Sequence, residues 1–306
     1  RLWRVGVLAL PCLAHAQTPV ADADGALQPV VITGSAADRQ RWLAPASIDV
    51  LDGSELRDGQ LQINLSEGMG RVPGLVIQNR NNYAQDLQIS LRGAGARATF
   101  GVRGVRLFVD GIPASAPDGQ GQAANFPLGS AERIEVIRGP ASVLHGEGAT
   151  GAVINVIPKK PFAGEVRNHL RLGYGSWDRQ QLGLDSGGSL SERLSYRLTL
   201  NQQAGNGWVD RTASRSLALS AALRFDASDD LSFTLAHDRG DAQPANYYGT
   251  PLIDGHYRSS LRKKNYNVQN DVQQYVDEWT RLTTDWALND QLSASNQLYY
   301  IKSRRH

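Results

Sequence analysis

The chain has 306 residues, and its 32 basic and 30 acidic side chains give a net charge of +2. At roughly 100 to 200 residues per domain, this length predicts two domains. Charges of both signs are spread along the chain, which excludes the basic footprint of a nucleic-acid-binding protein. No apolar run approaches the roughly 18 to 20 residues of a transmembrane helix, so a helical membrane protein is excluded as well.

Residues 1–16 are predicted to be a secretion signal. Basic residues precede a short apolar stretch, and Ala14-His15-Ala16 has the small-x-small pattern of a signal peptidase site. A buried N-terminal helix is the alternative, but Pro11 would interrupt it. Cys12 is the only cysteine and lies inside this segment, so the exported chain is expected to have no disulfide framework.

Residues 41–162 have the pattern of a compact α+β domain. A capping-box pair, Asn64 and Glu67, begins a stretch of helical spacing that Pro73-Gly74 ends. Asp110-Gly111 is a hairpin-type turn signal. Short β-branched runs predict strands at Leu75–Gln78, Leu87–Arg92, Arg106–Asp110, Ile134–Arg138 and Ala152–Ile157.

Residues 163–306 follow a different pattern, in which apolar and polar residues alternate over long stretches. Leu194, Tyr196, Leu198 and Leu200, for example, are separated by single polar residues. We predict seven strands, joined by short connections at 186–193, 226–230 and 289–291 and longer ones at 204–213 and 239–274. This is typical of antiparallel transmembrane β-barrel strands, with the barrel incomplete in this chain. A soluble antiparallel sandwich uses the same alternation and is the alternative.

Several motifs resemble those of TonB-dependent receptors. The stretch Glu132–Pro161 resembles their plug-domain signature, and Val72–Leu75, Ile89–Gly93 and Leu107–Pro113 resemble the motifs that precede it, in the same order. The resemblance implies an α+β plug domain followed by outer-membrane barrel strands. It also implies active transport across the outer membrane, with energy supplied by the partner protein TonB and its inner-membrane complex.

The sequence predicts neither a cofactor site nor a catalytic centre. Gly146, Gly148 and Gly151 match the spacing of a dinucleotide-binding loop, but the β-branched run after them predicts a strand where that site needs a helix. The six histidines lack metal-ligand spacing, and no nucleophile motif is present. We expect no enzyme activity, no cofactor and no metal.

The segment at residues 17–40 contains a stretch that resembles the TonB box of these receptors. The resemblance implies an extended periplasmic segment that adds a strand to a sheet of TonB. The alternative is the first strand of the plug. The stretch consists of Pro29, Val30, Val31, Ile32, Thr33, Gly34 and Ser35.

Two further sets of plug residues are candidates for function. The resemblance implies that Arg92 and Arg138 face the barrel wall and hold the plug in place, whereas solvated surface arginines are the alternative. Three polar, glycine-rich loops, 79–86, 94–103 and 114–125, are expected to bind ligand at the outward end of the plug. Their candidate residues are Asn81, Tyr83, Arg97, Phe100, Arg103 and Asn125.

The expected solute is a ferric siderophore. Asn246–Gly255 resembles an early extracellular loop segment of siderophore receptors, although cobalamin, haem and carbohydrate stay open. A signal-transducing receptor is the alternative function, but such receptors carry a further domain before the TonB box. A passive porin would need neither a plug nor a TonB box. We therefore expect a monomeric outer-membrane receptor with a periplasmic N-terminus, in contact with outer-membrane lipid.

Overall fold

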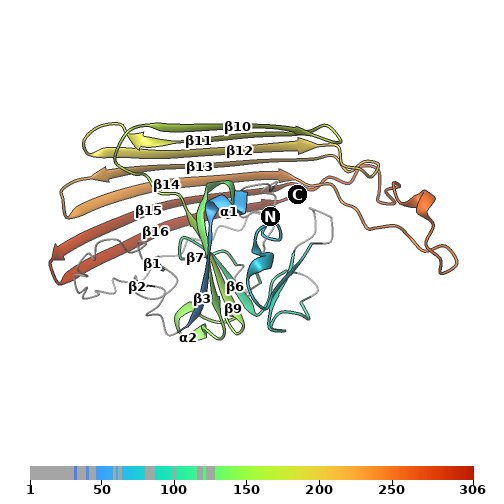
Figure 1. Ribbon diagram of the computed structural model, residues 1–306, viewed down its shortest axis with the longest axis horizontal. Helices are drawn as coiled ribbons and strands as arrows, with labels where there is room; N and C mark the ends of the chain where they lie inside the picture. The colour runs from blue at the N-terminus through green and yellow to red at the C-terminus, as the bar shows by residue number, and fades with distance from the viewer. Residues whose placement is uncertain are drawn as a thin grey trace. The chain divides into compact units, whose positions relative to one another are not determined.

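The computed structural model describes residues 31–32, 39–40, 46–57, 60, 64–79, 87–98, 101–115, 120–121 and 128–306. The expected secretion signal and most of the expected TonB box lie outside these residues. Two compact units meet in the sequence between Lys159 and Lys160. The first unit contains the described residues up to Lys159, and the second contains Lys160–His306 (Figure 1).

A five-stranded mixed sheet is the centre of the first unit (Figure 1). Its strands, in spatial order, are β3 (Ser47–Asp52), β8 (Ala131–Arg138), β9 (Ala152–Pro158), β6 (Val105–Val109) and β7 (Ile112–Pro113). Strands β6 and β9 are parallel, and the other neighbours are antiparallel. All seven residues of β9 are buried. A strand covered on both faces needs a continuous apolar run, which explains the composition of this segment.

The other described elements of the first unit are short. They are β1 (Val31–Ile32), β2 (Arg39–Gln40), α1 (Gly53–Arg57), η2 (Met69–Arg71), β4 (Leu75–Gln78), β5 (Gln88–Leu91), η3 (Leu128–Ser130) and α2 (Ser142–His145). Strands β4 and β5 form a separate antiparallel pair, as do β1 and β2. The five strands predicted between residues 75 and 157 are all present, with small shifts at their ends.

The predicted turn signals have different outcomes. Asp110 and Gly111 have φ values of 52° and 77°, and they join β6 to β7 as a two-residue type I′ hairpin. At the capping-box pair, the Asn64 amide donates to Glu67 Oε1 at 3.2 Å. The following residues nevertheless form turns and the three-residue helix η2. Glycines within this segment disfavour a longer α-helix.

The second unit is an antiparallel sheet whose seven strands follow the chain order, as predicted. We call this sheet the strand wall. Its strands are β10 (Arg167–Gly175), β11 (Arg179–Ser189), β12 (Leu194–Gly205), β13 (Ser214–Asp226), β14 (Leu231–Gln243), β15 (Tyr275–Asn289) and β16 (Leu292–Arg305). The sheet is open, with β10 and β16 as its edges. The loop between β14 and β15 contains the short helix η4 (Ser259–Leu261).

Connections at one end of the strand wall are two to four residues long, namely 190–193, 227–230 and 290–291. The opposite end carries the loops 206–213 and 244–274 and the three-residue turn 176–178. The first predicted connection, 186–193, is partly wrong because β11 continues through Gly187 and Gly188 to Ser189. Gly187 pairs with strands on both sides and Gly188 pairs with β12, which keeps these glycines in the sheet.

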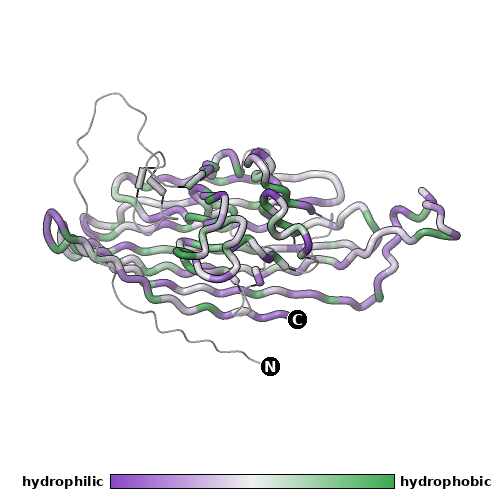
Figure 2. Tube along the Cα trace, turned by 90° about the horizontal axis from the view of Figure 1, so that it is seen from below, coloured by the Kyte–Doolittle hydropathy of each residue, from purple (hydrophilic) through white to green (hydrophobic). Residues whose placement is uncertain are grey.

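The register of the strand wall places leucines in rows across one face. Leu170, Leu184, Leu200 and Leu219 are successive partners on β10 to β13. Hydrophobic and hydrophilic residues are interspersed along the strands (Figure 2) and alternate most clearly in β12 and β13. Successive side chains of a strand point to opposite faces, so the residues between these leucines lie on the opposite face, which we call the polar face. Among the described residues, no helix is long and apolar enough to span a membrane.

Candidate functional site

The glycines of the plug signature allow close packing between three segments. A Cβ atom on Gly151 would lie 2.3 Å from the Cβ of Ala94. The Gly151 amide donates to the Gly104 carbonyl at 2.8 Å, and the Gly151 carbonyl accepts from the Gly139 amide at 2.8 Å. Strand β9 follows directly. The glycine motif is therefore structural, and the helix that a dinucleotide site requires is not formed there.

Strands β8 and β9 each bury one polar side chain that sequence analysis did not single out. Glu135 is fully buried, and its Oε1 lies 2.9 Å from Nη2 of Arg133. Asn155 on β9 is 1% exposed and accepts a hydrogen bond from the Gly111 amide at 3.2 Å. This bond connects the centre of the sheet to the β6–β7 turn. The signal available in the sequence was a single polar residue within an otherwise apolar run.

The two candidate lock arginines lie at different places in the plug. Nε of Arg138, at the end of β8, lies 2.7 Å from Oδ2 of Asp49 on β3. Arg92 follows β5 with a φ of 47°, and its amide donates to the Gly74 carbonyl at 3.0 Å. Its side chain is exposed. Asp49 is thus a local partner of Arg138, and the role of both arginines as a lock stays a prediction.

The candidate ligand residues are described only in part, because Asn81, Tyr83, Phe100 and Asn125 lie outside the described residues. Arg97 and Arg103 are both exposed. Nη2 of Arg103 donates to Oε1 of Gln120 at 3.5 Å. An antiparallel bridge between Val102 and Gly121, with bonds of 2.8 and 2.9 Å, brings two of the three predicted loops together.

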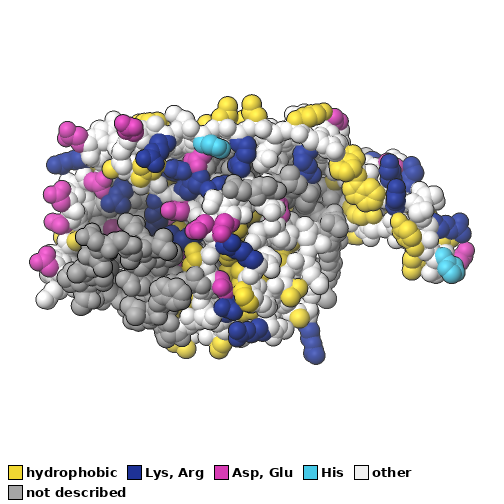
Figure 3. All heavy atoms as spheres, in the orientation of Figure 1, with side chains coloured by type: hydrophobic (Ala, Val, Ile, Leu, Met, Phe, Trp, Pro, Cys, Tyr) yellow, Lys and Arg dark blue, Asp and Glu magenta, His cyan; other side chains and the backbone are white. Residues whose placement is uncertain are grey.

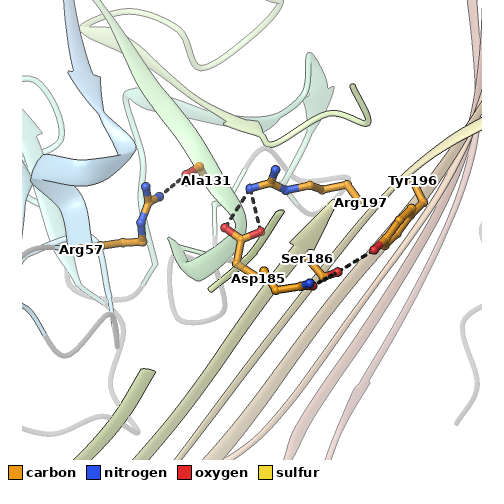
Figure 4. A network of polar contacts seen from close by, with 7 residues as sticks. Arg57, Ala131, Asp185, Ser186, Tyr196 and Arg197 are labelled. Atoms are coloured by element: carbon orange, nitrogen blue, oxygen red, sulfur yellow. Dashed lines mark hydrogen bonds and ion pairs between the residues drawn. The ribbon is translucent and has the colours of Figure 1, made fainter. Parts of the chain in front are cut away.

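The apolar face of the strand wall exposes large hydrophobic side chains. Leu172 is 73% exposed, Leu235 50% and Leu298 49%. Exposed aromatic residues lie near both ends of this face, with Tyr174 beside the turn 176–178 and Phe225 and Trp286 near the short connections. Near the short connections, the Tyr196 hydroxyl and Ser186 Oγ are 2.8 Å apart (Figure 4). An exposed apolar face with aromatic residues near its border is typical of the lipid-facing side of an outer-membrane barrel.

Charged residues on the strand wall form ion pairs between neighbouring strands. On the polar face, Nη2 of Arg197 lies 2.7 Å from Oδ1 of Asp185, and Nη2 of Arg281 lies 2.7 Å from Oδ2 of Asp238. Figure 4 shows the first pair, together with the bond of 2.7 Å from Arg57 to the Ala131 carbonyl in the first unit. A polar face with paired charges suits the interior of a barrel.

The two long loops of the strand wall are bound to each other. The Asp210 amide donates to the Lys263 carbonyl at 2.8 Å, and Oδ2 of Asp210 lies 2.9 Å from Nζ of Lys264. The hydrogen bond from Lys264 to Asp210 raises the pKa of the lysine. The loop 244–274 projects beyond the strands and carries exposed hydrophobic and basic side chains (Figures 1 and 3). Its exposed tyrosines are Tyr248, Tyr257 and Tyr266.

The described residues show no group of three or more histidine, cysteine, aspartate or glutamate side chains placed to hold a metal ion. The features that the structure does bring together are a glycine-packed mixed sheet and a strand wall with one apolar and one polar face. Joined long loops lie at one end of that wall.

Comparisons with known proteins agree with these features. Residues 42–153 match the model of the TonB-dependent Receptor Plug Domain. The ferripyoverdine receptor of Pseudomonas aeruginosa is 30% identical over 234 residues, covering 73% of this chain and 27% of the receptor. The vitamin B12 transporter BtuB of Vibrio vulnificus is 26% identical over 227 residues, covering 73% of this chain and 35% of the transporter. The chain thus spans about a third or less of either relative.

A solved structure shows the same fold. The pyoverdine outer membrane receptor FpvA of Pseudomonas aeruginosa, bound to pyoverdine, has a TM-score of 0.74 and 22% identity, covering 88% of this chain and 39% of the receptor. The plug domain and the antiparallel strands of this chain therefore correspond to part of a plugged receptor barrel. From the plug match, the receptor relatives and the shared fold, the chain belongs to the TonB-dependent receptor family.

Proposed function

We propose that the intact protein transports a scarce solute inward across the outer membrane, with energy delivered through TonB, and that the solute is a ferric siderophore. The observation that carries this proposal is the plug domain followed by the strand wall, in a chain 30% identical to a ferripyoverdine receptor. The relatives are transport receptors rather than enzymes. The exposed apolar face of the strand wall supports a location in the outer membrane, in contact with lipid.

The long loops support ligand capture at the outer surface. Exposed Tyr248 and Tyr257 lie on a loop that Asp210 holds in place through Lys263 and Lys264. Aromatic side chains can pack against the flat faces of an iron chelate. Arg97 and Arg103 of the plug are exposed and cationic, and they would attract an anionic chelate.

Uptake by the intact receptor tests the solute. We expect a deletion strain to lose accumulation of one radioiron-labelled complex among ferripyoverdine, ferric enterobactin and ferric citrate, and to regain it with the gene on a plasmid. Labelled cobalamin tests the alternative solute that the vitamin B12 transporter suggests. Unchanged uptake of every ferric complex would contradict the siderophore proposal, and loss of cobalamin uptake would replace it.

Variants of Ile32 test the coupling of this receptor to TonB. Ile32 lies in β1, which pairs with β2, and in the stretch proposed to add a strand to TonB. Ile32→Pro removes the amide donor that an added strand needs and fixes its own φ near about −65°, whereas Ile32→Val keeps both the donor and the β preference. We expect the proline variant to bind solute on whole cells but to accumulate none, and the valine variant to transport normally.

The same measurements identify the failure of the coupling proposal. Lost surface binding or lost assembly of the Ile32→Pro variant would make the segment a strand of the plug instead. Undiminished uptake by that variant would place the TonB contact elsewhere. If the protein were a signal-transducing receptor instead, uptake would be unchanged and the transcriptional response to the solute would be lost.

A further inference from the structure

A phenylalanine at the start of the second unit lies over a glycine in the strand wall. Arg167 on β10, Gly187 on β11 and Arg197 on β12 are successive register partners, so they form one row on the polar face. Because Gly187 has no side chain, its neighbours can lie directly over the strand. A Cβ atom on Gly187 would lie 2.8 Å from Cδ of Arg197 and 2.9 Å from Cε1 of Phe162, so the Arg197 side chain and the phenylalanine ring share the space over Gly187.

Both arginines of the row also interact with the ring. The guanidinium carbons of Arg167 and Arg197 lie 5.8 and 5.6 Å from the centroid of Phe162. These distances are within the range of about 6 Å for cation–π attraction. Nη2 of Arg197 lies 2.7 Å from Oδ1 and 2.8 Å from Oδ2 of Asp185 (Figure 4), which holds the guanidinium in place. We call Phe162, Arg167, Gly187 and Arg197 the Phe162 clamp.

Backbone contacts fix the residues that follow Phe162. The Gly164 amide donates to Ser189 Oγ at 3.0 Å, and the Ser189 amide donates to the Gly164 carbonyl at 2.9 Å. A Cβ atom on Gly188 would lie 2.7 Å from the Cα of Val166. The second glycine of β11 thus lets the segment 163–166 approach the strand closely.

The clamp lies immediately after the plug in the sequence. The Lys159 amide donates to the Ser130 carbonyl of the first unit at 2.8 Å. Only Lys160 and Pro161 separate this residue from Phe162. We propose that Phe162 is a positioning residue that fixes the chain leaving the plug to strands β10, β11 and β12. The chain is then anchored to the strand wall three residues after Lys159, the last residue of the first unit.

Ordinary apolar packing of Phe162 is the competing explanation, and two substitutions separate it from the clamp. Phe162→Leu keeps an apolar side chain but has no aromatic face for the arginines. Phe162→Trp keeps the aromatic face, for which cations have the strongest preference. If the clamp explanation holds, the Phe162→Trp variant must keep the segment 163–166 better ordered than the Phe162→Leu variant.

Hydrogen exchange of the intact receptor, purified without solute, measures the order of this segment. We expect Phe162→Ala to accelerate exchange of the Gly164 and Ser189 amides by about tenfold or more, because their protection depends on closed local structure. Phe162→Leu should accelerate it nearly as much, and Phe162→Trp little. Phe225→Ala, which removes a phenylalanine from the apolar face of β13, is the matched control and should leave these amides unchanged.

Arg167→Gln repeats the test without changing Phe162, in case Phe162→Ala does not assemble. This substitution removes one of the two cations, so a smaller acceleration at Gly164 and Ser189 is expected. The proposal would be overturned if these amides exchanged at the wild-type rate in Phe162→Ala or Arg167→Gln. It would also be overturned if Phe162→Leu kept them fully protected. The measurement needs no transported solute, so its failure and the failure of the proposed function are distinguishable.

Discussion

Strand β9 of the plug and strand β12 of the strand wall are both rich in aliphatic residues, yet they bury them differently. All seven residues of β9 are buried, so its sequence is nearly continuous in apolar residues. In β12, Leu194, Tyr196, Leu198 and Leu200 share one face, and polar residues share the other. The difference shows that β9 is enclosed by protein on both faces, whereas β12 has one face suited to lipid.

The two regions also place their polar groups differently. The plug sheet buries isolated groups such as Glu135 and Asn155, each held by a specific partner. The strand wall has a whole polar face, on which Asp185 and Arg197 pair between adjacent strands. A buried polar group without a partner is costly, so the plug allows few of them. A polar barrel interior tolerates many polar and charged side chains.

The largest expected effect is in the plug core. Ile154 in β9 is completely buried, so Ile154→Ala removes packed methyl groups and leaves a cavity. We expect it to lower the free energy of unfolding by about 2 to 5 kcal/mol, measured by denaturant titration of the intact receptor. Val76→Ala on β4, where the side chain is 49% exposed, should change stability by less than about 0.5 kcal/mol. Equal effects would mean that β9 is not enclosed on both faces.

Substitutions at two neighbouring residues of one strand test the two faces of the strand wall. Leu219 and Ser220 are neighbours on β13 that point to opposite faces. Leu219→Arg places a charge on the face proposed to contact lipid and is expected to cost about 2 to 4 kcal/mol near the bilayer centre. Ser220→Arg should be milder. Recovery of heat-modifiable barrel on gels measures assembly, and a reversed order would exchange the two faces.

A smaller effect is expected at the polar group of β9. Asn155→Leu removes the hydrogen bond to the Gly111 amide and should lower stability by about 1 kcal/mol. Hydrogen exchange of the Gly111 amide should accelerate, while β10 to β16 should be unaffected. No change at Gly111 would show that the β6–β7 turn holds without this bond.

The smallest effect is a pH dependence at the surface of the plug. A hydrogen bond from Arg71 lowers the pKa of Glu55 in α1. A lowered folded-state pKa gives stability that is present above the unfolded pKa and lost as pH falls through the folded one. Glu55→Gln should therefore lower the melting temperature slightly at neutral pH and not at all at acidic pH. An equal decrease at both values would assign the effect to packing.

Much of this architecture could be predicted from local sequence patterns. The alternation after residue 163 predicted seven strands, and seven are present. Asp110-Gly111 predicted its hairpin because both residues must take positive φ, which few residue types tolerate. The capping-box pair forms its bond, but the expected helical segment shortens to η2, because glycines weaken it.

The sequence by itself determined the strand periods, the turn chemistry and the plug signature, since each depends on residues close together in the chain. Only the tertiary structure decided that Arg138 pairs with Asp49, that Gly151 packs against Ala94, and that Phe162 packs over Gly187. These contacts depend on strand register and sheet order. A shift of one residue would move every side chain of a strand to the other face, so local patterns cannot specify such partners.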